Sequence, residues 1–304
     1  MASVAVLDCG SNSTRLLIAA HDGTTLQREM RITRLSAGVD SSNTLSREAL
    51  QRTYDTLSEY RAMMDVHGVS RGLLVATSAV RDATNGAEFL ARAAQITGVA
   101  SRILTGTEEA AFSYAGATSG LDPDSRPTLI VDIGGGSTEL AVRLDAVVCG
   151  YSMQLGCVRV TERTLGAGVV SSGARSAAMV MIEAELDRAF DAVPEFTQLV
   201  GAVRLVGLAG TVATLAQLDA GLRVYERAAV HHRRLARADV QAWCDRLGAL
   251  TPAQRLELPG MVPGREDVLV AGLYILDAVM GRFAAEELLS SEDDILDGVA
   301  SSLR

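Results

Sequence analysis

The chain has 304 residues with 48% apolar and 4% aromatic content, and 37 acidic against 28 basic residues give a net charge of −9. This length suits two domains, and cores poor in aromatic residues are common in α/β folds. The negative charge argues against nucleic acid as a partner. We expect no membrane span and no secretion signal, and four scattered cysteines fit a reducing compartment, so we expect a cytoplasmic protein.

The first half of the chain predicts an antiparallel meander followed by alternating helices and strands. Ser46 is expected to cap a helix in which Leu50, Tyr54 and Leu57 begin an apolar face at spacings of three and four. The expected elements in order are strands at 4–7, 16–20 and 24–33, a helix after 46, a strand at 73–77, a helix at 87–96 and a strand at 102–104.

The second half of the chain starts in the same way. The expected elements are strands at 128–131, 139–142 and 147–153, helices within 172–192, a strand at 204–208, helices at 211–218, 239–249 and 265–283, a strand at 287–290 and a helix from 294. The turn-forming, polar stretch at 120–127 predicts a domain boundary there.

An internal repeat is the most informative feature of the sequence. Residues 7–16 align without a gap on residues 131–140, so that Asp8 matches Asp132 and Gly10 matches Gly134. Each copy places an acidic residue at a strand end before a tight turn of small residues. Such turns bring backbone N–H groups close to an anion, and hydroxyl groups add donors. A hairpin turn needs no aspartate at the strand end, so the duplication favours two phosphate-binding loops that face each other across a cleft.

Three further segments have the pattern of anion-binding or catalytic junctions. Residues 77–85 and 208–214 each follow a strand and open a helix, where free N–H groups attract anions, and Arg81 could add a bidentate phosphate contact. Glu108 and Glu109 stand at a helix start, where carboxylates are favourable in any case. One of them could instead act as a general base.

The absence of several well-known motifs excludes other enzyme classes. The sequence has no G-x-S-x-G, Walker A or dinucleotide-binding fingerprint, which removes serine hydrolases, P-loop enzymes and simple dehydrogenases. The four histidines have no metal or triad spacing, and the basic run 231–234 is more typical of a solvated surface than of a binding site.

The motifs in this order resemble the Ppx/GppA family of exopolyphosphatases and guanosine pentaphosphate phosphohydrolases. The matching stretches span nearly the whole chain and are 8–15, 77–85, 106–110, 132–139, 155–159, 207–215 and 263–272. The resemblance implies an α/β protein with two ribonuclease-H-like domains of the actin, sugar kinase and heat-shock ATPase superfamily, and a cleft between them. We expect a first domain at 1–122, a second at 123–292, and a C-terminal helix at about 293–304 packing back on the first.

The resemblance also implies roles for individual residues. Glu109 corresponds to the catalytic base, with Glu139 as a second catalytic carboxylate, and Mg²⁺ is the expected cofactor. The expected metal ligands are Asp132, Glu139 and Asp8. The expected phosphate-binding residues are Ser11, Asn12, Ser13, Arg15, Arg81, Gly134, Gly135, Gly136, Ser137, Gly210 and Thr211.

Two departures from the family pattern bear on the substrate. The sequence ends at Arg304, so we expect it to lack the additional C-terminal domains of long family members, and the usual Leu-Arg-Glu-Gly of the family reads Ile-Leu-Asp-Gly at 295–298. Both favour shorter polymers. We therefore expect an exopolyphosphatase that releases terminal phosphate from polyphosphate. The alternatives are a guanosine pentaphosphate 5′-phosphohydrolase, a kinase or nucleotidase of the same superfamily, and a non-catalytic sensor; a homodimer is left open.

Overall fold

The computed structural model describes residues 3–145 and 147–304, and contacts divide the chain into two compact units. The first unit contains the described residues up to Gly116 together with Ile295–Arg304, and the second is Ala117–Asp294. The division lies in the last turns of a helix, slightly before the turn-rich segment that the sequence suggested. No helix in the described part of the chain is long and apolar enough to cross a membrane.

A five-stranded sheet in the order β3-β2-β1-β4-β5 forms the centre of the first unit. β2 pairs antiparallel with both β1 and β3, whereas β1, β4 and β5 run parallel. The elements are β1 (Ser3–Cys9), β2 (Ser13–Ala20), β3 (Thr25–Ile32), α1 (Val39–Ser42), α2 (Arg47–Val66), β4 (Arg71–Ala76), α3 (Ser78–Asp82), α4 (Gly86–Thr97), β5 (Ala100–Ile103), α5 (Gly106–Thr118) and α14 (Ile295–Leu303).

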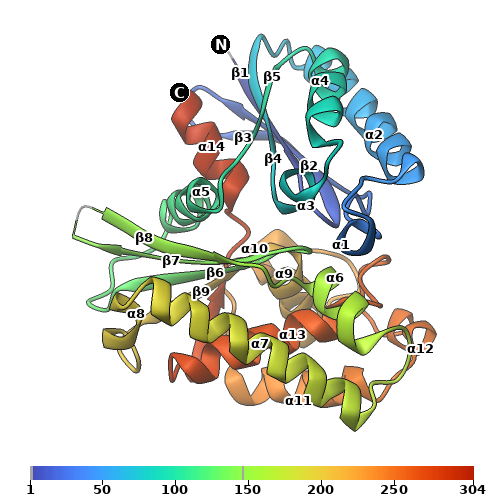
Figure 1. Ribbon diagram of the computed structural model, residues 1–304. Coiled ribbons are helices and arrows are strands. Elements are labelled where there is room, and N and C mark those ends of the chain that lie inside the picture. The colour runs from blue at the N-terminus through green and yellow to red at the C-terminus, as the bar shows by residue number, and fades with distance from the viewer. Residues whose placement is uncertain (1–2, 146) are drawn as a thin grey trace. The chain divides into compact units, whose positions relative to one another are not determined.

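Helices cover both faces of this sheet (Figure 1). On one face α2 packs through Leu57, Tyr60 and Met64, and the Ser46 hydroxyl caps the helix by accepting from the Ala49 N–H. On the other face α14 contributes its own small core with β1 and β2. A Cβ at Gly298 would lie 2.0 Å from the Phe112 carbonyl oxygen, so glycine is what lets α14 approach α5 closely.

The second unit repeats the topology of the first. Its sheet has the order β10-β11-β9-β6-β7-β8, which matches the first sheet with one antiparallel strand, β10, added at the edge. The elements are β6 (Thr128–Ile133), β7 (Thr138–Leu144), β8 (Val147–Met153), α6 (Cys157–Val160), a π-helix (Thr161–Leu165), α7 (Ser172–Ala192), α8 (Glu195–Gln198), β9 (Arg204–Leu208), α9 (Ala209–Asp219), α10 (Arg227–Val230), β10 (Arg234–Ala236), α11 (Arg237–Gly248), α12 (Pro252–Leu256), α13 (Leu269–Arg282) and β11 (Glu287–Ser290).

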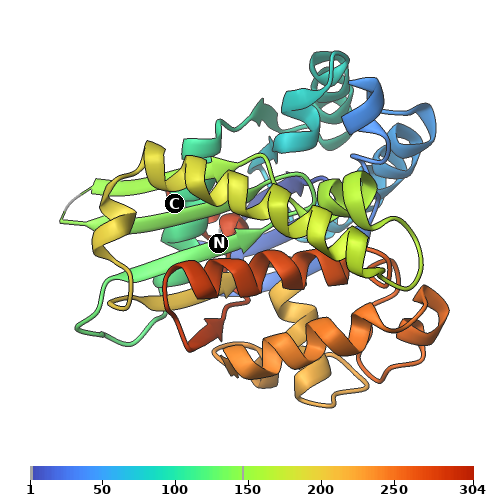
Figure 2. The same ribbon diagram turned by 60° about the horizontal axis from the view of Figure 1, so that its bottom comes forward.

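Two long helices, α7 and α13, run across one face of the second sheet (Figure 2). α7 buries Ala178, Ile182 and Leu186, and α13 is apolar on nearly every side because it packs against α7, α11 and the sheet. The duplicated sheet order confirms the internal repeat and the α/β, ribonuclease-H-like class of both units.

The structure corrects several expected element boundaries. α13 begins at Leu269 rather than at 265, and β10 at Arg234–Ala236 was not expected. The short helices α1, α6, α8, α10 and α12 and the π-helix were not expected. The segments at 77–85 and 106–110 do open helices, as the sequence indicated, and form α3 and the start of α5.

Candidate functional site

The loop after β1 has its carbonyl oxygens anchored and its N–H groups available. The Gly10 N–H donates to the Ser13 carbonyl oxygen at 3.0 Å, and the carbonyl oxygens of Ser11 and Asn12 accept backbone N–H groups from residues 33–36. Within the residues that the structure describes, the N–H groups of Ser11 and Asn12 have no acceptor, and the buried Asn12 Nδ2 has no partner. Donors held in this way form a cradle for an anion.

The loop after β6 repeats this arrangement. The Gly134 N–H donates to the Ser137 carbonyl oxygen, again at 3.0 Å. The carbonyl oxygens of Gly134, Gly135 and Gly136 accept hydrogen bonds from residues 157–159 at 2.8–3.1 Å. The N–H groups of Gly135 and Gly136 donate to no residue in the described ranges. The second unit therefore has its own cradle of backbone donors.

A close backbone approach holds this second loop in place. Gly156, at the start of α6, lies so near the loop that a Cβ there would be 2.3 Å from the Gly135 carbonyl oxygen. Glycine is thus required at this position by contact. The sequence showed Gly156 only as part of a family-like stretch, and nothing in its local pattern predicted this role.

The strand-end carboxylates are handled differently in the two repeats. Asp8 lies opposite Arg15 on the neighbouring strand, and the Arg15 Nε and one terminal nitrogen donate to Asp8 Oδ2 at 3.0 and 2.7 Å. At the matching positions of the second unit, Asp132 lies opposite Glu139. Both carboxylates are buried and occupy the same face of the sheet. The first repeat neutralises its aspartate with an arginine, whereas the second repeat adds a second negative charge.

The carboxylates of Asp132 and Glu139 are a suitable partial ligand set for Mg²⁺. Like charges directly opposite each other on a sheet are destabilising, and a divalent cation would relieve this. Mg²⁺ is commonly held by one or two carboxylates, with water and substrate phosphates completing its shell. No cluster of three or more metal-ligating side chains occurs in residues 3–145 and 147–304. The Ser152 hydroxyl donates to Glu139 Oε1 at 2.6 Å and fixes that carboxylate.

The two neighbouring glutamates at the start of α5 have separate tasks. Glu108 is a capping residue: it accepts from the Thr105 N–H and hydroxyl, each at 2.9 Å, and pairs with Arg102. The backbone hydrogen bond from Thr105, followed by the bond from Arg102, lowers the pKa of Glu108 to about 2. Glu109, by contrast, is only 7% exposed and does not take part in the cap.

Glu109 is held by Arg81. One terminal nitrogen of Arg81 donates to Glu109 Oε2 at 3.2 Å and to the Leu104 carbonyl oxygen at 2.9 Å. The other terminal nitrogen is buried without a partner in the described part of the chain. Arg81 therefore positions the carboxylate and keeps donors for a further acceptor.

The remaining expected binding residues are not equally exposed to a ligand. The Ser11 hydroxyl forms a hydrogen bond of 2.9 Å with the Ser78 hydroxyl and so links the first loop to α3. The backbone carbonyl oxygens of Ser13 and Ser137 close their loops by accepting the N–H groups of Gly10 and Gly134. Thr211 is 1% exposed, and its side chain packs against Gly272 in α13, so the side chain is not placed to bind phosphate.

Sequence reasoning missed a buried arginine beside α9. A Cβ at Gly210 would lie 1.8 Å from an Arg265 terminal nitrogen, so the guanidinium covers the first turn of this helix. Arg265 is 8% exposed. It lies in the family-like stretch 263–272, but an arginine in a presumed helix start gave no indication of this contact.

The two units thus have the fold and loop chemistry of a two-domain α/β enzyme that handles phosphate. The Ppx/GppA phosphatase family model matches residues 17–303, and the chain belongs to this family. It is 39% identical to exopolyphosphatase 2 of Mycobacterium tuberculosis, with 99% of this chain and 98% of that protein covered. A guanosine-5′-triphosphate,3′-diphosphate pyrophosphatase of Vibrio campbellii is 32% identical over 97% of this chain, which spans 58% of that longer protein.

Solved structures show the same fold. An exopolyphosphatase-like protein is 35% identical, with a TM-score of 0.92 and 98% of each chain covered. The Aquifex aeolicus member of the family is 28% identical, with a TM-score of 0.80 and coverage of 99% of this chain and 97% of that chain.

Proposed function

We propose that this protein is an exopolyphosphatase that hydrolyses the terminal phosphoanhydride bond of inorganic polyphosphate and releases orthophosphate. The observation that carries the proposal is the duplicated loop: its carbonyl oxygens are anchored, and the N–H groups of its two central residues have no acceptor among the described residues. Two such cradles suit a substrate with a chain of phosphate groups. The full-length similarity to a mycobacterial exopolyphosphatase supports polyphosphate as the substrate.

In this proposal each residue type has a defined task. The N–H groups of Ser11, Asn12, Gly135 and Gly136 would bind phosphate oxygens, and Arg81 would offer its remaining donors. When bound by Asp132 and Glu139, Mg²⁺ would neutralise charge that develops on the transferred phosphate.

Glu109 is the proposed general base. It would orient a water molecule and accept its proton, as phosphoryl-transfer enzymes require of one positioned carboxylate. Glu139 remains the alternative base, although its hydrogen bond from Ser152 and its place opposite Asp132 favour metal binding. Asp8 is assigned to holding Arg15 rather than to binding metal, because the two already form an ion pair.

A guanosine pentaphosphate 5′-phosphohydrolase is the second candidate. The Vibrio relatives support it, and both substrates present a terminal phosphoanhydride. We also propose that the protein works in the cytoplasm without nucleic acid; its four cysteines form no disulfide. A homodimer is a further open prediction.

Phosphate release from polyphosphate with excess Mg²⁺, and again with excess EDTA, tests the proposed chemistry. We expect turnover with Mg²⁺ and its loss in chelator, restored by adding Mg²⁺ back. Full turnover in EDTA would remove the metal role of Asp132 and Glu139, and tight binding of polyphosphate without any phosphate release would identify a sensor.

A further inference from the structure

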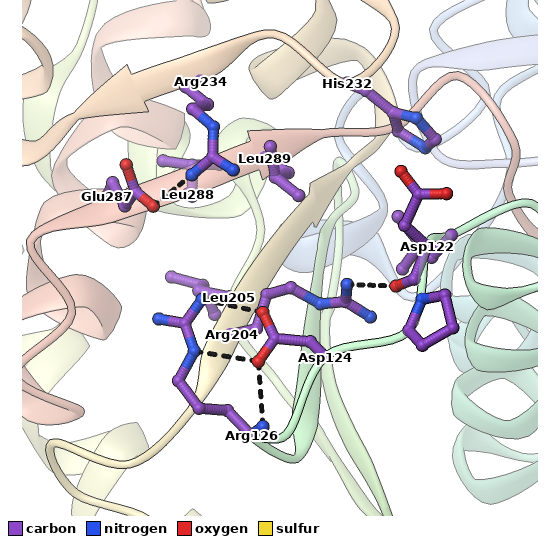
Figure 3. Close-up of a pocket in the computed structure, with 12 residues that line it drawn as sticks. Asp122, Asp124, Arg126, Arg204, Leu205, His232, Arg234, Glu287, Leu288 and Leu289 are labelled. Carbon is purple, nitrogen blue, oxygen red and sulfur yellow. Dashed lines mark hydrogen bonds and ion pairs between the residues drawn. The ribbon is translucent and has the colours of Figure 1, made fainter.

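The second unit contains a cavity of about 280 Å³ at the end of its sheet opposite the glycine loop (Figure 3). Arg204 and Glu287, which line it, are the first residues of β9 and β11, whereas the glycine loop follows the last residue of β6. The connecting segment 121–126 forms another wall. The cavity is therefore separate from the candidate catalytic residues of this unit, and none of the roles assigned above uses it.

Two arginines of the cavity are already neutralised by carboxylates. Arg126 forms two side-chain hydrogen bonds with Asp124, at 3.1 and 2.9 Å, and Arg234 pairs with Glu287 at 2.5 Å. The Arg126 side chain, helped by its own backbone N–H, holds the pKa of Asp124 well below its usual range. These pairs are complete without a ligand.

The third arginine, Arg204, donates only to uncharged oxygens. It bonds to Thr128 Oγ1 from two nitrogens, at 3.1 and 2.8 Å, and to the backbone carbonyl oxygen of Asp122 at 2.6 Å. No carboxylate among the described residues accepts a hydrogen bond from Arg204. A guanidinium has five N–H donors, so Arg204 keeps donors for another acceptor.

Two polar groups beside Arg204 also lack protein partners. His232 Nε2 is buried and forms no hydrogen bond with any residue in 3–145 or 147–304. No hydrogen bond within the same ranges reaches the Asp122 carboxylate. Figure 3 shows this carboxylate directed toward the His232 ring, with both groups lining the cavity. The buried His232 Nε2 without a partner is costly, and a bound ligand or water would satisfy it. Asp122 is an exposed residue, so its carboxylate is open to solvent or to a ligand in the cavity.

These three groups have the chemistry that recognises a protonated phosphate group. The phosphate's charged oxygens would accept from Arg204 and from His232 in its Nε2-protonated form, and its P–OH would donate to the Asp122 carboxylate. Sulfate at neutral pH has no proton to donate, so the carboxylate would repel it. We propose that this cavity is a binding site for a phosphate group that keeps a P–OH proton, either free hydrogen phosphate or a singly protonated phosphate monoester, and that Asp122 selects it over sulfate.

The cavity has room for such a ligand and for accompanying water. A water molecule takes up about 30 Å³ in the liquid. The cavity volume of about 280 Å³ is several times this value, which leaves room for a phosphate ion and for water beside it. Phosphate is also the product of the proposed reaction. The proposal that the cavity binds phosphate does not depend on the proposed function. Its interpretation as a site that senses the reaction product does rest on that function.

The test measures binding of inorganic phosphate, glycerol phosphate and sulfate to the full chain by calorimetry, with EDTA present and at about pH 6, where the monoester still carries a proton on about half of its molecules. Asn12→Ala removes only the side-chain donor of the loop after β1 and keeps the backbone N–H groups, so the binding that is lost in Arg204→Gln defines the share of the cavity. We expect phosphate or glycerol phosphate to bind at least tenfold more tightly than sulfate, and the ratio of the first two identifies free phosphate or a monoester as the ligand. This binding should persist in Asn12→Ala.

Two cavity variants decide the assignment. Asp122→Asn leaves the backbone contact with Arg204 intact and should bring the affinities for phosphate and sulfate within about threefold of each other. Arg204→Gln should weaken phosphate binding at least tenfold, whereas Arg92→Gln, at an exposed position in α4, should not. Polyphosphate hydrolysis should remain in both cavity variants. Equal binding of sulfate and phosphate by the unmodified protein, or unchanged selectivity in Asp122→Asn, would overturn the proposal and leave the proposed function standing.

Discussion

At the scale of single residues, the main result is that equivalent positions in the two repeats carry opposite charges. Arg15 neutralises Asp8 in the first unit, and Glu139 faces Asp132 in the second. A duplicated fold has therefore placed an internal ion pair in one unit and a potential cation site in the other. This difference is the reason for proposing that the second unit, and not the first, binds the metal.

The metal assignment predicts different effects of neutralising the two strand-end aspartates. Asp132→Asn should raise the Mg²⁺ concentration for half-maximal phosphate release at least tenfold, because one of two carboxylate ligands loses its charge. Asp8→Asn should leave that concentration within about twofold and act instead through a loosened Arg15. Mg²⁺ titrations of both variants give the answer. An equal Mg²⁺ dependence for Asp132→Asn and the unmodified protein would refute the assignment.

Glu109 and Glu108 provide a matched pair for testing the general base. Glu109→Gln keeps the shape of the side chain but removes proton acceptance, so turnover should fall by about two to four orders of magnitude. Substrate affinity should stay unchanged or tighten slightly. Glu108→Gln should have nearly normal turnover, because Glu108 caps α5 and pairs with Arg102.

The same two variants also show which result would contradict the assignment of Glu109 as general base. If Glu109→Gln retains a near-normal kcat, as Glu108→Gln is expected to do, Glu109 is not the base. The role would then pass to Glu139, and a kcat loss in Glu139→Gln at saturating Mg²⁺ would separate base catalysis from metal binding.

At the scale of elements, the glycine loop after β6 depends on the start of α6. Gly156→Ala would place a methyl group 2.3 Å from the Gly135 carbonyl oxygen, so the loop or the helix must shift. Overpacking of this kind costs about 1–3 kcal/mol of stability. Because the same loop presents the N–H groups proposed to bind phosphate, we expect phosphate release to fall at least tenfold.

Gly173 in α7 is the matched control for this substitution. A Cβ there meets no atom within 4 Å, and Ala is the better helix former, so Gly173→Ala should be neutral or stabilising. Thermal denaturation and phosphate-release assays on both variants check the prediction. A fully active and stable Gly156→Ala protein would show that the loop does not require this contact.

Elements with strong periodicity could be predicted from the sequence, and elements defined by tertiary contacts could not. The helix after Ser46 and the strand at 287–290 carry clear caps or apolar patterns. β10 has only three residues and forms through its pairing with β11, so its sequence is too short to show a strand pattern. The residues before Leu269 look helical, but they turn aside and Arg265 covers Gly210 instead.

The same distinction applies to the candidate site. The loops and the strand-end carboxylates were found because their pattern occurs twice, and duplication is visible in a sequence. Ser78, Ser152 and Arg265 act through partners 67, 13 and 55 residues away in the chain, and no local pattern records such contacts. The sequence also could not show that Arg15 and Arg81 are paired with carboxylates in the folded protein.

At the scale of the whole molecule, the net charge of −9 limits how a long polyanion can be held. Electrostatic repulsion grows with polymer length, whereas the backbone cradles contact only a few phosphate groups. The protein should therefore prefer short and medium polyphosphates, and kcat/KM should not rise steadily into chains of hundreds of units.

The most direct test of the account is kcat/KM for phosphate release with Mg²⁺, measured side by side on short polyphosphate, long polyphosphate, guanosine pentaphosphate and ATP. We predict the highest value for short or medium polyphosphate, a lower value for guanosine pentaphosphate, and little release from ATP. A higher value for guanosine pentaphosphate than for every polyphosphate would contradict the proposed substrate, and absence of release from all four would contradict the enzyme assignment itself.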